Sequence, residues 1–595
     1  MQQEAGVDGI DEMSDYDEVR SSFQLQAPER FNFAGDVLDR WAEEPTKLAI
    51  WWVDDAGHEV KRTFAELCVE SRKLCNALAE KGVKRGDVVV VILPRLIEWW
   101  VINIACLRMG AVISPGTTQL KAKDIRYRLL AAEAACIITD AEVAPRVDEV
   151  IESCPGIRCR ILVEPEVAGG SQQGDARQVD GSSAGTAAAG GDTGGATCQT
   201  DAAAGGDAAG EVDAGWHSYH ELLAAASDEF ETADTGSDEG AILYFTSGTT
   251  GYPKMTLHTH ASYPLGHKIT GKFWLDLGED DLHWNVSDTG WAKAAWSSLF
   301  GPWNMGAAVF VHRSPRFDPT KTLQVLASYP ITTLCAAPTV YRMLVLEDLT
   351  TCGFPSLRHC VAAGEPLNPE VIEVWRQATG ITIRDGYGQT ESVLLVGSFP
   401  FIEARAGSMG KPAPGFEVGV IDEQGNELAV GQEGDIAVRV KPNRPVGLFK
   451  EYWKDPQRTA NSYREDWYIT GDRATRDEDG YLWFVGRADD VIVSAGYRIG
   501  PFEVESALLE HEAVAESAVV ASPDEVRGAV VKAFVVLKPG HRASDELARQ
   551  LQETVKSATA PYKYPRKIEF VDSLPKTMSG KIRRAALREA EWQGT

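Results

Sequence analysis

An amphipathic segment, a short apolar run and a second apolar segment follow one another early in the chain, and this order constrains the fold most strongly. Residues 63–80 place apolar side chains near one face of a helix that Thr63 can cap. The run DVVVVILP, residues 87–94, is typical of a buried parallel strand, and residues 97–111 are typical of a helix packed on it. This alternation predicts an α/β fold.

The length and charge of the chain limit its architecture and its partners. A chain of 595 residues is too long for one hydrophobic core, so several domains or subdomains are expected. The 59 basic and 87 acidic residues give a net charge of -28, which argues against a general nucleic-acid or anionic-membrane surface. Any anionic ligand must therefore be held by local clusters of basic side chains.

The cysteine pattern and the first residues of the chain indicate the cellular compartment in which the protein is expected. The ten cysteines include no CxxC pair and no Cys/His metal spacing, and the chain opens with the acidic Met1-Gln2-Gln3-Glu4. These features predict a cytoplasmic protein in a reducing environment. The apolar stretch from Trp99 to Cys106 is too short to span a bilayer, so no transmembrane segment is expected. The oligomeric state cannot be predicted from these features.

Two composition changes divide the chain. Residues 168–215 are Gly, Ala, Ser and Asp with almost no large apolar side chain, which predicts a disordered insertion in a surface loop. Residues 516–537 carry two apolar strands joined by a polar turn, between helical segments at 501–511 and 544–557. The prediction is a large N-terminal α/β body and a small, mobile C-terminal α+β domain. We assign residues 1–28 to a disordered acidic N-terminus, 29–488 to the body and 489–595 to the C-terminal domain.

A glycine- and hydroxyl-rich loop, Tyr244 to Met255, directly follows an apolar run and predicts an anion site. Glycines let backbone N–H groups approach a phosphate, the Ser and Thr hydroxyls add donors, and Lys254 adds a positive charge. The P-loop spacing G-x-x-x-x-G-K-[ST] is not met, because Gly251 is followed by Tyr252-Pro253-Lys254-Met255. Taken alone, the loop is equally compatible with a polar turn.

Four further motifs follow in order: DGYGQTE (385–391), YITGD (468–472), GRADDVIVSAGYRIGPFEVE (486–505) and LPKTMSGKIRR (574–584). Together with the loop at 244–255 they resemble the core motifs of the adenylate-forming superfamily of acyl-CoA synthetases and AMP-dependent ligases. Further stretches such as LPRLIEWW and VSDTGW resemble its medium-chain acyl-CoA synthetase branch. The resemblance covers roughly residues 30 to 590, apart from the insertion. It implies that a carboxylate attacks the α-phosphate of ATP, giving acyl-AMP and pyrophosphate, and that coenzyme A then takes the acyl group.

The resemblance implies an ATP site in which the loop holds the β- and γ-phosphates. Tyr387 would stack on adenine, Asp472 would bind the ribose hydroxyls, and Arg487 would contact ribose or phosphate. The implied ATP-binding residues are Thr246, Ser247, Gly248, Thr249, Thr250, Gly251, Tyr252, Pro253, Lys254, Asp385, Gly386, Tyr387, Gly388, Gln389, Thr390, Asp472, Arg487 and Lys581.

The resemblance also implies the residues that act on the reacting groups. Lys581 would stabilise negative charge between the carboxylate and the α-phosphate, and Thr390 would donate to the α-phosphate or the acyl carbonyl. Glu391 would be the Mg²⁺ ligand, Arg498 would lie near the phosphates, and Asp489 would be the hinge of the C-terminal domain. Without the other motifs, the carboxylates at these positions are compatible with solvated turns.

A basic and aromatic cluster in this acidic chain, YKYPRK at 562–567, suits the phosphates and adenine of coenzyme A. The alternative is a solubilising surface patch. The resemblance implies the following coenzyme A residues: Gln119, Ala495, Gly496, Tyr497, Arg527, Lys556, Tyr564, Pro565 and Arg566.

The acid itself is the least defined part of the sequence-based interpretation. Trp291 is a candidate wall of the acyl pocket, and Gly388 implies room for an acyl chain longer than acetate. Straight-chain, branched and aromatic acids of medium size all remain compatible. The alternative functions are an adenylating enzyme that loads a carrier protein and a nucleotide-binding homologue without catalysis. His258 and His260 are two residues apart and do not predict a zinc pair.

Overall fold

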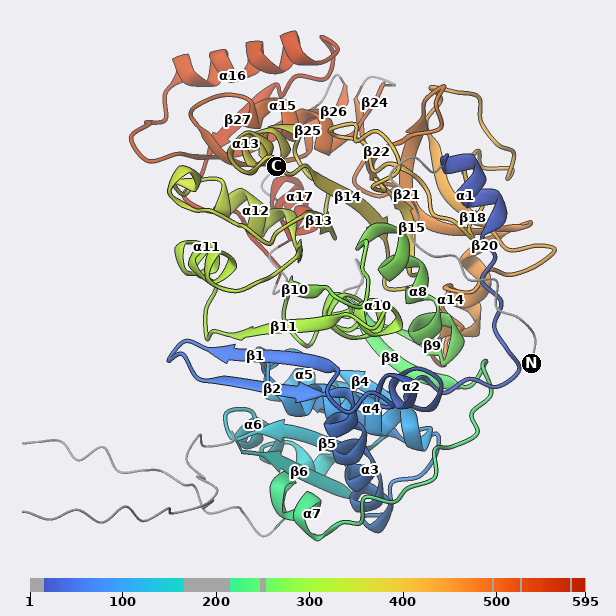
Figure 1. Cartoon of the computed structure of the whole chain (residues 1–595). Coiled ribbons are helices and arrows are strands. Elements are labelled where there is room, and N and C mark those ends of the chain that lie inside the picture. Colours follow the sequence, from blue (N-terminus) through green and yellow to red (C-terminus); the bar gives the residue numbers. More distant parts are fainter. Residues whose placement is uncertain are drawn as a thin grey trace, which may run out of the picture.

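The computed structural model describes residues 15–164, 215–246, 253–494, 497–524, 527–577 and 581–593 of the chain. Two large sheets, a smaller antiparallel sheet and a separate C-terminal α+β unit make up the molecule. Figure 1 shows the C-terminal unit, in red, at the opposite end from the sheet that carries β4, β5 and β6. The predicted α/β class with a small C-terminal domain is confirmed.

The first large sheet has eight strands, and its central strands are parallel. It contains the predicted buried strand, β3, whose five residues are all buried. In spatial order the strands are β19 (Glu451–Tyr452), β9 (Lys254–Thr259), β8 (Gly240–Thr246), β4 (Val112–Pro115), β3 (Val88–Ile92), β5 (Ala134–Asp140), β6 (Cys159–Val163) and β7 (His217–Ser218).

The second large sheet has nine strands, of which β14, β13, β12, β10, β11 and β1 run parallel. In spatial order they are β16 (Lys411–Pro412), β15 (Leu394–Gly397), β14 (Ile383–Gly388), β13 (His359–Ala363), β12 (Thr333–Ala336), β10 (Leu282–Val286), β11 (Ala308–Arg313), β1 (Leu48–Asp54) and β2 (Glu59–Thr63). The carboxyl ends of parallel strands meet at one edge, where open α/β sheets bind their ligands.

The two predicted N-terminal helices form as expected. α3 (Phe64–Glu80) begins at Thr63, whose hydroxyl accepts from Glu66 N while the Glu66 side chain accepts from Thr63 N, a complete capping box. α4 (Ile97–Met109) is apolar all round and buried along almost its whole length. One core contains side chains from both helices and from both large sheets, so α4 joins the sheets into one body.

The N-terminal body contains further helical segments. They are α2 (Asp39–Trp41), α5 (Ala122–Ala131), α6 (Ala144–Asp148), α7 (Tyr219–Ala225), α8 (His267–Ile269), α9 (Ala292–Ala295), α10 (Gly301–Asn304), α11 (Pro319–Ser328), α12 (Pro338–Leu344), α13 (Pro369–Thr379) and α14 (Pro456–Asn461). Six short segments are π or 3-10 helices: η1 (Ala34–Leu38), η2 (Ile151–Ser153), η3 (Ala261–Leu265), η4 (Thr270–Trp274), η5 (Trp296–Phe300) and η6 (Leu349–Thr351). None of the helices in the described ranges combines the length and apolarity needed to cross a bilayer.

The antiparallel sheet precedes the C-terminal domain. Its strands are β17 (Val418–Ile421), β18 (Gly434–Arg439), β21 (Trp467–Arg476), β20 (Tyr463–Arg464) and β22 (Leu482–Arg487). The C-terminal domain follows with β23 (Ile492–Ser494), β24 (Tyr497–Ile499), α15 (Pro501–Leu509), β25 (Val514–Asp524), β26 (Gly528–Leu537), α16 (Asp545–Ala558), β27 (Lys567–Phe570) and α17 (Arg584–Gln593). Its own core is formed by side chains from β23 to α16, which agrees with the predicted separate domain.

The structure differs from the expected disordered N-terminus over residues 15–28. α1 (Tyr16–Ser22) begins at Asp15, and the Tyr16 hydroxyl donates to Pro412 O at 2.8 Å. Two apolar side chains, Tyr16 and Val19, enter the core beside the antiparallel sheet, so burial outweighs the acidic composition. Residues 1–14 and most of the predicted insertion, residues 168–214, lie outside the described residues.

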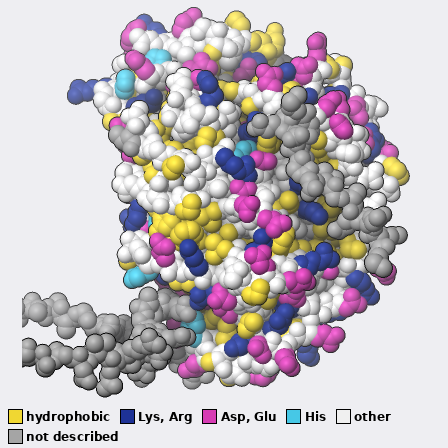
Figure 2. All heavy atoms as spheres, in the orientation of Figure 1, with side chains coloured by type: hydrophobic (Ala, Val, Ile, Leu, Met, Phe, Trp, Pro, Cys, Tyr) yellow, Lys and Arg dark blue, Asp and Glu magenta, His cyan; other side chains and the backbone are white. Residues whose placement is uncertain are grey.

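Acidic and basic side chains are interspersed on the face of the molecule in Figure 2, without a continuous basic area.

Candidate active site

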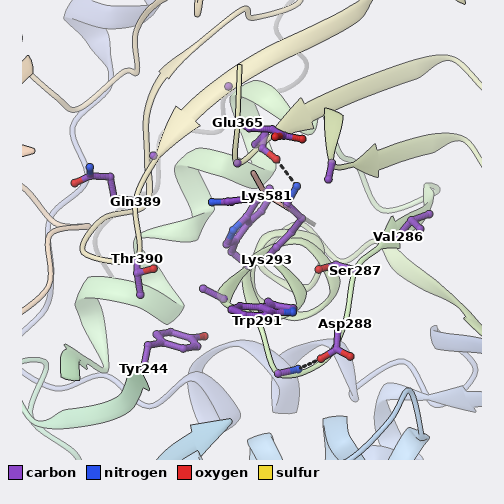
Figure 3. Close-up of a pocket in the computed structure, with 18 of the residues that line it drawn as sticks. Tyr244, Val286, Ser287, Asp288, Trp291, Lys293, Glu365, Gln389, Thr390 and Lys581 are labelled. Carbon is purple, nitrogen blue, oxygen red and sulfur yellow. Dashed lines mark hydrogen bonds between the residues drawn. The ribbon is translucent and has the colours of Figure 1, made fainter. Parts of the chain in front are cut away.

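A cavity of about 480 Å³ lies where the carboxyl ends of four parallel strands meet. The residues that follow β10, β12, β13 and β14 all contribute to its wall, as does the end of β8. Figure 3 shows side chains from these segments pointing into one space. The sheet edge therefore gathers motifs that are 335 residues apart in sequence (581 minus 246), because Thr246, which ends β8, and Lys581, which precedes α17, both line the cavity.

One part of the wall is apolar. Trp291, Trp296, Val340 and Met343 line it together with Trp274 from η4. The structure places the predicted acyl-pocket residue Trp291 in the cavity, directly before α9. This wall offers a hydrocarbon chain or an aromatic ring a surface on which to pack.

Gly290, in the sequence SDTGW, is required by a close backbone approach. A Cβ at this position would lie 2.1 Å from Thr117 N, so any other residue would collide with the segment that carries Gln119. The motif therefore brings Trp291 and the loop at 117–119 together.

Lys581 and Thr390 line the same cavity. The Lys581 backbone N–H donates to the Thr577 hydroxyl at 3.1 Å, which closes the loop before α17. The side chain keeps an accessible surface within the cavity, but surrounding protein atoms lower the pKa of Lys581; Glu365 and Asp472 oppose this effect and Arg487 adds to it. In this structure the C-terminal domain therefore brings Lys581 into a cavity of the N-terminal body.

A buried histidine, His258, makes a hydrogen bond to the backbone carbonyl of Thr390. Burial lowers the pKa of His258 to about 3, so its imidazole is neutral. Nε2 donates to Thr390 O at 2.7 Å, and Nδ1 accepts from the Ser262 hydroxyl at 3.0 Å. His258 thus has a supporting role, and the described residues contain no metal-binding cluster around it.

The predicted ribose-binding group Asp472 is gathered with three other motif residues. Tyr387 OH and Gln389 Nε2 each donate to Asp472 Oδ2 at 2.6 Å. Arg487 Nε lies 4.0 Å from the other oxygen, Oδ1. Three separate motifs therefore meet around one carboxylate.

Asp385 and Gly388 have structural functions that sequence analysis did not anticipate. Burial raises the pKa of Asp385 to about 7, and its oxygens accept from the backbone N–H groups of Gly386 and Leu367.

A Cβ at Gly388 would lie 2.6 Å from Val393 O, so the backbone of β14 requires glycine there, whatever the substrate. Gly388 also lines the cavity.

Glu391, the predicted metal ligand, is linked to the phosphate loop through a tyrosine. Tyr452 OH donates to Glu391 Oε1 at 2.7 Å, and Lys254 Nζ lies 5.4 Å from the centre of the Tyr452 ring. Pairing of β19 with β9 sets these positions. The loop residues Ser247 to Tyr252 lie outside the described residues.

We expect Tyr452→Phe to weaken magnesium binding because it removes the donor that orients Glu391. A lost hydrogen bond to a charged group corresponds to a roughly 10-fold higher metal requirement. The measurement is Mn²⁺ binding in the presence of ATP, followed by electron paramagnetic resonance. Tyr463→Phe is the matched control, because its buried hydroxyl has no hydrogen-bond partner among the described residues. Equal Mn²⁺ affinity in both variants would contradict this function of Tyr452.

Several of the predicted coenzyme A residues fall into two groups of contacts within the C-terminal domain. Tyr497 stacks on Tyr562 with ring centroids 4.4 Å apart. Lys556 Nζ lies 4.6 Å from the Tyr564 ring centre, and Arg566 Nη1 donates to Tyr564 OH at 2.9 Å.

The other predicted coenzyme A residues lie apart from these contacts. Pro565 O accepts from the Gln552 side chain, Arg527 is exposed beside Asp524, and Gln119 is exposed on the N-terminal body. Ala495 and Gly496 lie outside the described residues.

Arg498 and Asp489 are not part of the cavity wall. Arg498 is exposed on β24, and Asp489 is exposed in the turn after β22. The Asp489 carbonyl accepts from Arg588 Nη1 at 2.9 Å, so the predicted hinge contacts α17.

Sequence analysis missed Lys293 and Glu365, which both line the cavity beside Lys581. Lys293 lies in α9, and Glu365 follows β13. The stretch AKAA around Lys293 has no recognisable spacing, so only the fold reveals its position.

Comparison with family models decides the family. Residues 38–453 match the AMP-binding enzyme model, and residues 503–581 match the AMP-binding enzyme C-terminal domain model. The chain belongs to the AMP-binding enzyme family. The resemblance inferred from the five motifs is confirmed, as is the expectation of an AMP-forming ligase, which implies ATP as a substrate.

Relatives in this AMP-binding family are similar over nearly the whole chain. The human and mouse proteins named acyl-coenzyme A synthetase ACSM3, mitochondrial, are each 50% identical to it, covering 98% of this chain and 93% and 94% of their own length. Among solved structures, the anthranilate CoA ligase AuaEII in complex with anthranoyl-AMP matches with a TM-score of 0.80 at 28% identity, covering 95% of this chain and 98% of that one. A benzoate CoA ligase from Burkholderia xenovorans LB400 matches with a TM-score of 0.77 at 27% identity, covering 94% of this chain and all of that one.

The predicted cytoplasmic location is contradicted by these relatives, which are named as mitochondrial. The prediction used the acidic opening and the lack of CxxC pairs and of Cys/His metal spacing among the ten cysteines. Import depends on a short targeting segment, and the composition of the remaining chain carries no information about it.

Proposed function

We propose that the protein is an ATP-dependent acyl-CoA synthetase that joins a medium-sized carboxylic acid to coenzyme A through an acyl-AMP intermediate, releasing AMP and pyrophosphate. The observation that carries the proposal is the meeting of Lys581 and Thr390 in a cavity with an apolar wall. A cation and a hydroxyl that share one cavity support the reaction of a carboxylate with an α-phosphate there.

Two adjacent groups of residues fit the two parts of an acyl-adenylate, and Gln389, which lines the cavity and donates to Asp472, connects them. Tyr387, Asp472 and Arg487 would hold the nucleoside, while the tryptophan-lined wall would receive the acyl group. Lys581 would stabilise the charge that develops as the carboxylate oxygen attacks phosphorus. A volume of about 480 Å³ suits an acid of medium size.

Magnesium fits this donor set as a shared ion. Glu391 offers one carboxylate, and no group of three metal-binding side chains occurs in the described ranges. Mg²⁺ commonly binds through one or two carboxylates with phosphate oxygens and water. When bound, it would neutralise phosphate charge, while Tyr452 would fix the orientation of Glu391.

Coenzyme A is proposed as the acyl acceptor because cations and aromatic rings gather in the C-terminal domain. Arg566, Lys556 and Tyr564 form one group, and Tyr497 forms another with Tyr562. These groups suit phosphate and adenine recognition. A carrier-protein arm presents neither an adenine nor a 3′-phosphate.

The test is carboxylate-dependent ATP–pyrophosphate exchange with acids from acetate to decanoate and with benzoate. AMP release is then measured with and without coenzyme A. We expect exchange with a medium-sized acid and sustained turnover only with coenzyme A. Exchange that ignores coenzyme A would favour carrier-protein loading, and no exchange with any acid would overturn the proposal.

We expect Asp489→Pro to separate the two half-reactions. Proline fixes φ near −65°, which would hinder rotation of the C-terminal domain about this turn. The Asp489 N–H makes no hydrogen bond within the described chain, so the fold should be kept. Exchange and thioester formation would be measured separately, with Asp489→Ala as the control. Full rates for both half-reactions in the proline variant would show that residue 489 is not the hinge.

A further inference from the structure

Two lysines from different domains converge on Gly364, at the end of β13. A Cβ built at this glycine would lie 3.6 Å from Lys293 Nζ and 3.8 Å from Lys581 Cε. Lys293 comes from α9 of the N-terminal body, whereas Lys581 comes from the C-terminal domain. Figure 3 shows the two side chains beside each other in the cavity.

Lys293 has a hydrogen bond but no ion pair. Its ammonium group donates to Ala363 O, and no carboxylate in the described part of the chain lies within ion-pairing distance of it. Burial lowers the pKa of Lys293, and Lys581 lowers it further, while Cys335, Glu365 and Asp385 oppose the shift. A buried cation without a charged partner is costly.

The nearby carboxylates are already engaged elsewhere. Glu365 Oε1 accepts from Arg342 at 2.8 Å and from the Thr339 backbone N–H at 3.0 Å. Asp385 accepts from two backbone N–H groups and is half protonated near neutrality, since burial raises its pKa to about 7. Neither carboxylate supplies the missing partner for Lys293.

We propose that Lys293 binds a carboxylate oxygen of the acid substrate and holds it beside Lys581 for attack on the α-phosphate. This inference rests on the proposed function, and it assigns the charge that recognises the acid group. Trp291, which directly precedes α9, and Trp296, which directly follows it, contact the hydrocarbon part from the same segment. One stretch of six residues, 291–296, thereby recognises both ends of the acid.

The test compares octanoate with octanamide, its neutral analogue of nearly the same shape. In Lys293→Met, we expect the KM for octanoate in pyrophosphate exchange to rise about 10- to 100-fold, as for a lost hydrogen bond between charged groups. The inhibition constant of octanamide and the KM for ATP should not change, and Lys293→Arg should recover part of the octanoate affinity.

Two further variants separate charge from folding. Lys293→Gln replaces the ammonium group with a neutral N–H donor on a side chain one bond shorter, so it should reproduce the effect if the methionine variant folds poorly. Lys272→Met is the matched control, because Lys272 is a partly buried lysine above the Phe273 ring and does not line the cavity.

An unchanged KM for octanoate, or equal losses for octanoate and octanamide, would overturn the assignment of Lys293. Absence of exchange in the unaltered protein with octanoate and every other acid would instead overturn the proposed function.

Discussion

Lys581→Met should abolish most of the adenylation activity and leave the second half-reaction intact. Lys581 is the described cation that the C-terminal domain brings into the cavity. Its removal takes away a cation that stabilises the negative charge developing on the reacting oxygens, and loss of one such stabilising group lowers rates by about 10²–10³-fold. Pyrophosphate exchange would fall by this factor, whereas supplied acyl-AMP would still react with coenzyme A.

Lys576→Met is the matched control for this experiment. Lys576 lies in the same segment, but its ammonium group pairs with Glu516 at 2.7 Å and does not line the cavity. The control should keep full exchange activity. If Lys581→Met slowed both half-reactions equally, the lysine would have a structural function and its assignment to adenylation would be wrong.

Arg584→Met should produce the largest loss of stability among the changes considered. Arg584 Nε and Nη2 donate to Glu505 at 2.9 and 2.5 Å, and Glu505 also accepts from Val519 N at 2.8 Å. Glu505 is 4% exposed, so removing its partner leaves a buried carboxylate unpaired. Breaking such a pair costs about 3–5 kcal/mol.

The loss should be confined to the C-terminal domain. Urea unfolding and hydrogen exchange should show weaker protection of α15 and α17, while the two large sheets keep their stability. Because α17 follows Lys581 directly, adenylation should fall as well. Arg583→Met is the control, since the neighbouring Arg583 is exposed and makes no ion pair among the described residues. Equal stability of the two variants would show that the Arg584–Glu505 pair contributes little.

Local patterns predicted the elements whose residues carry their own signals. The capping residue Thr63, the valine run of β3 and the paired strands β25 and β26 were all expected from periodicity and turn chemistry. The five motifs predicted the family for the same reason, since each motif is contiguous in sequence.

Other features depended on contacts between distant segments. Tyr16 becomes ordered through Pro412, and Glu391 is oriented by Tyr452, although neither pairing has a sequence signal. Gly388 was interpreted through the substrate, whereas the structure shows that the backbone at Val393 requires it.

Sequence alone determined the α/β class, the two-domain organisation and the identity of the motif residues, because strand and helix periodicity and phosphate-loop chemistry are local properties. Tertiary structure decided which charges meet. Lys293 lies 288 residues before Lys581 in the sequence. The contact of Lys293 with β13 and the position of the C-terminal domain together bring the two lysines to Gly364. The physical reason is that charge interactions depend on distance in space, which the order of residues along the chain does not specify.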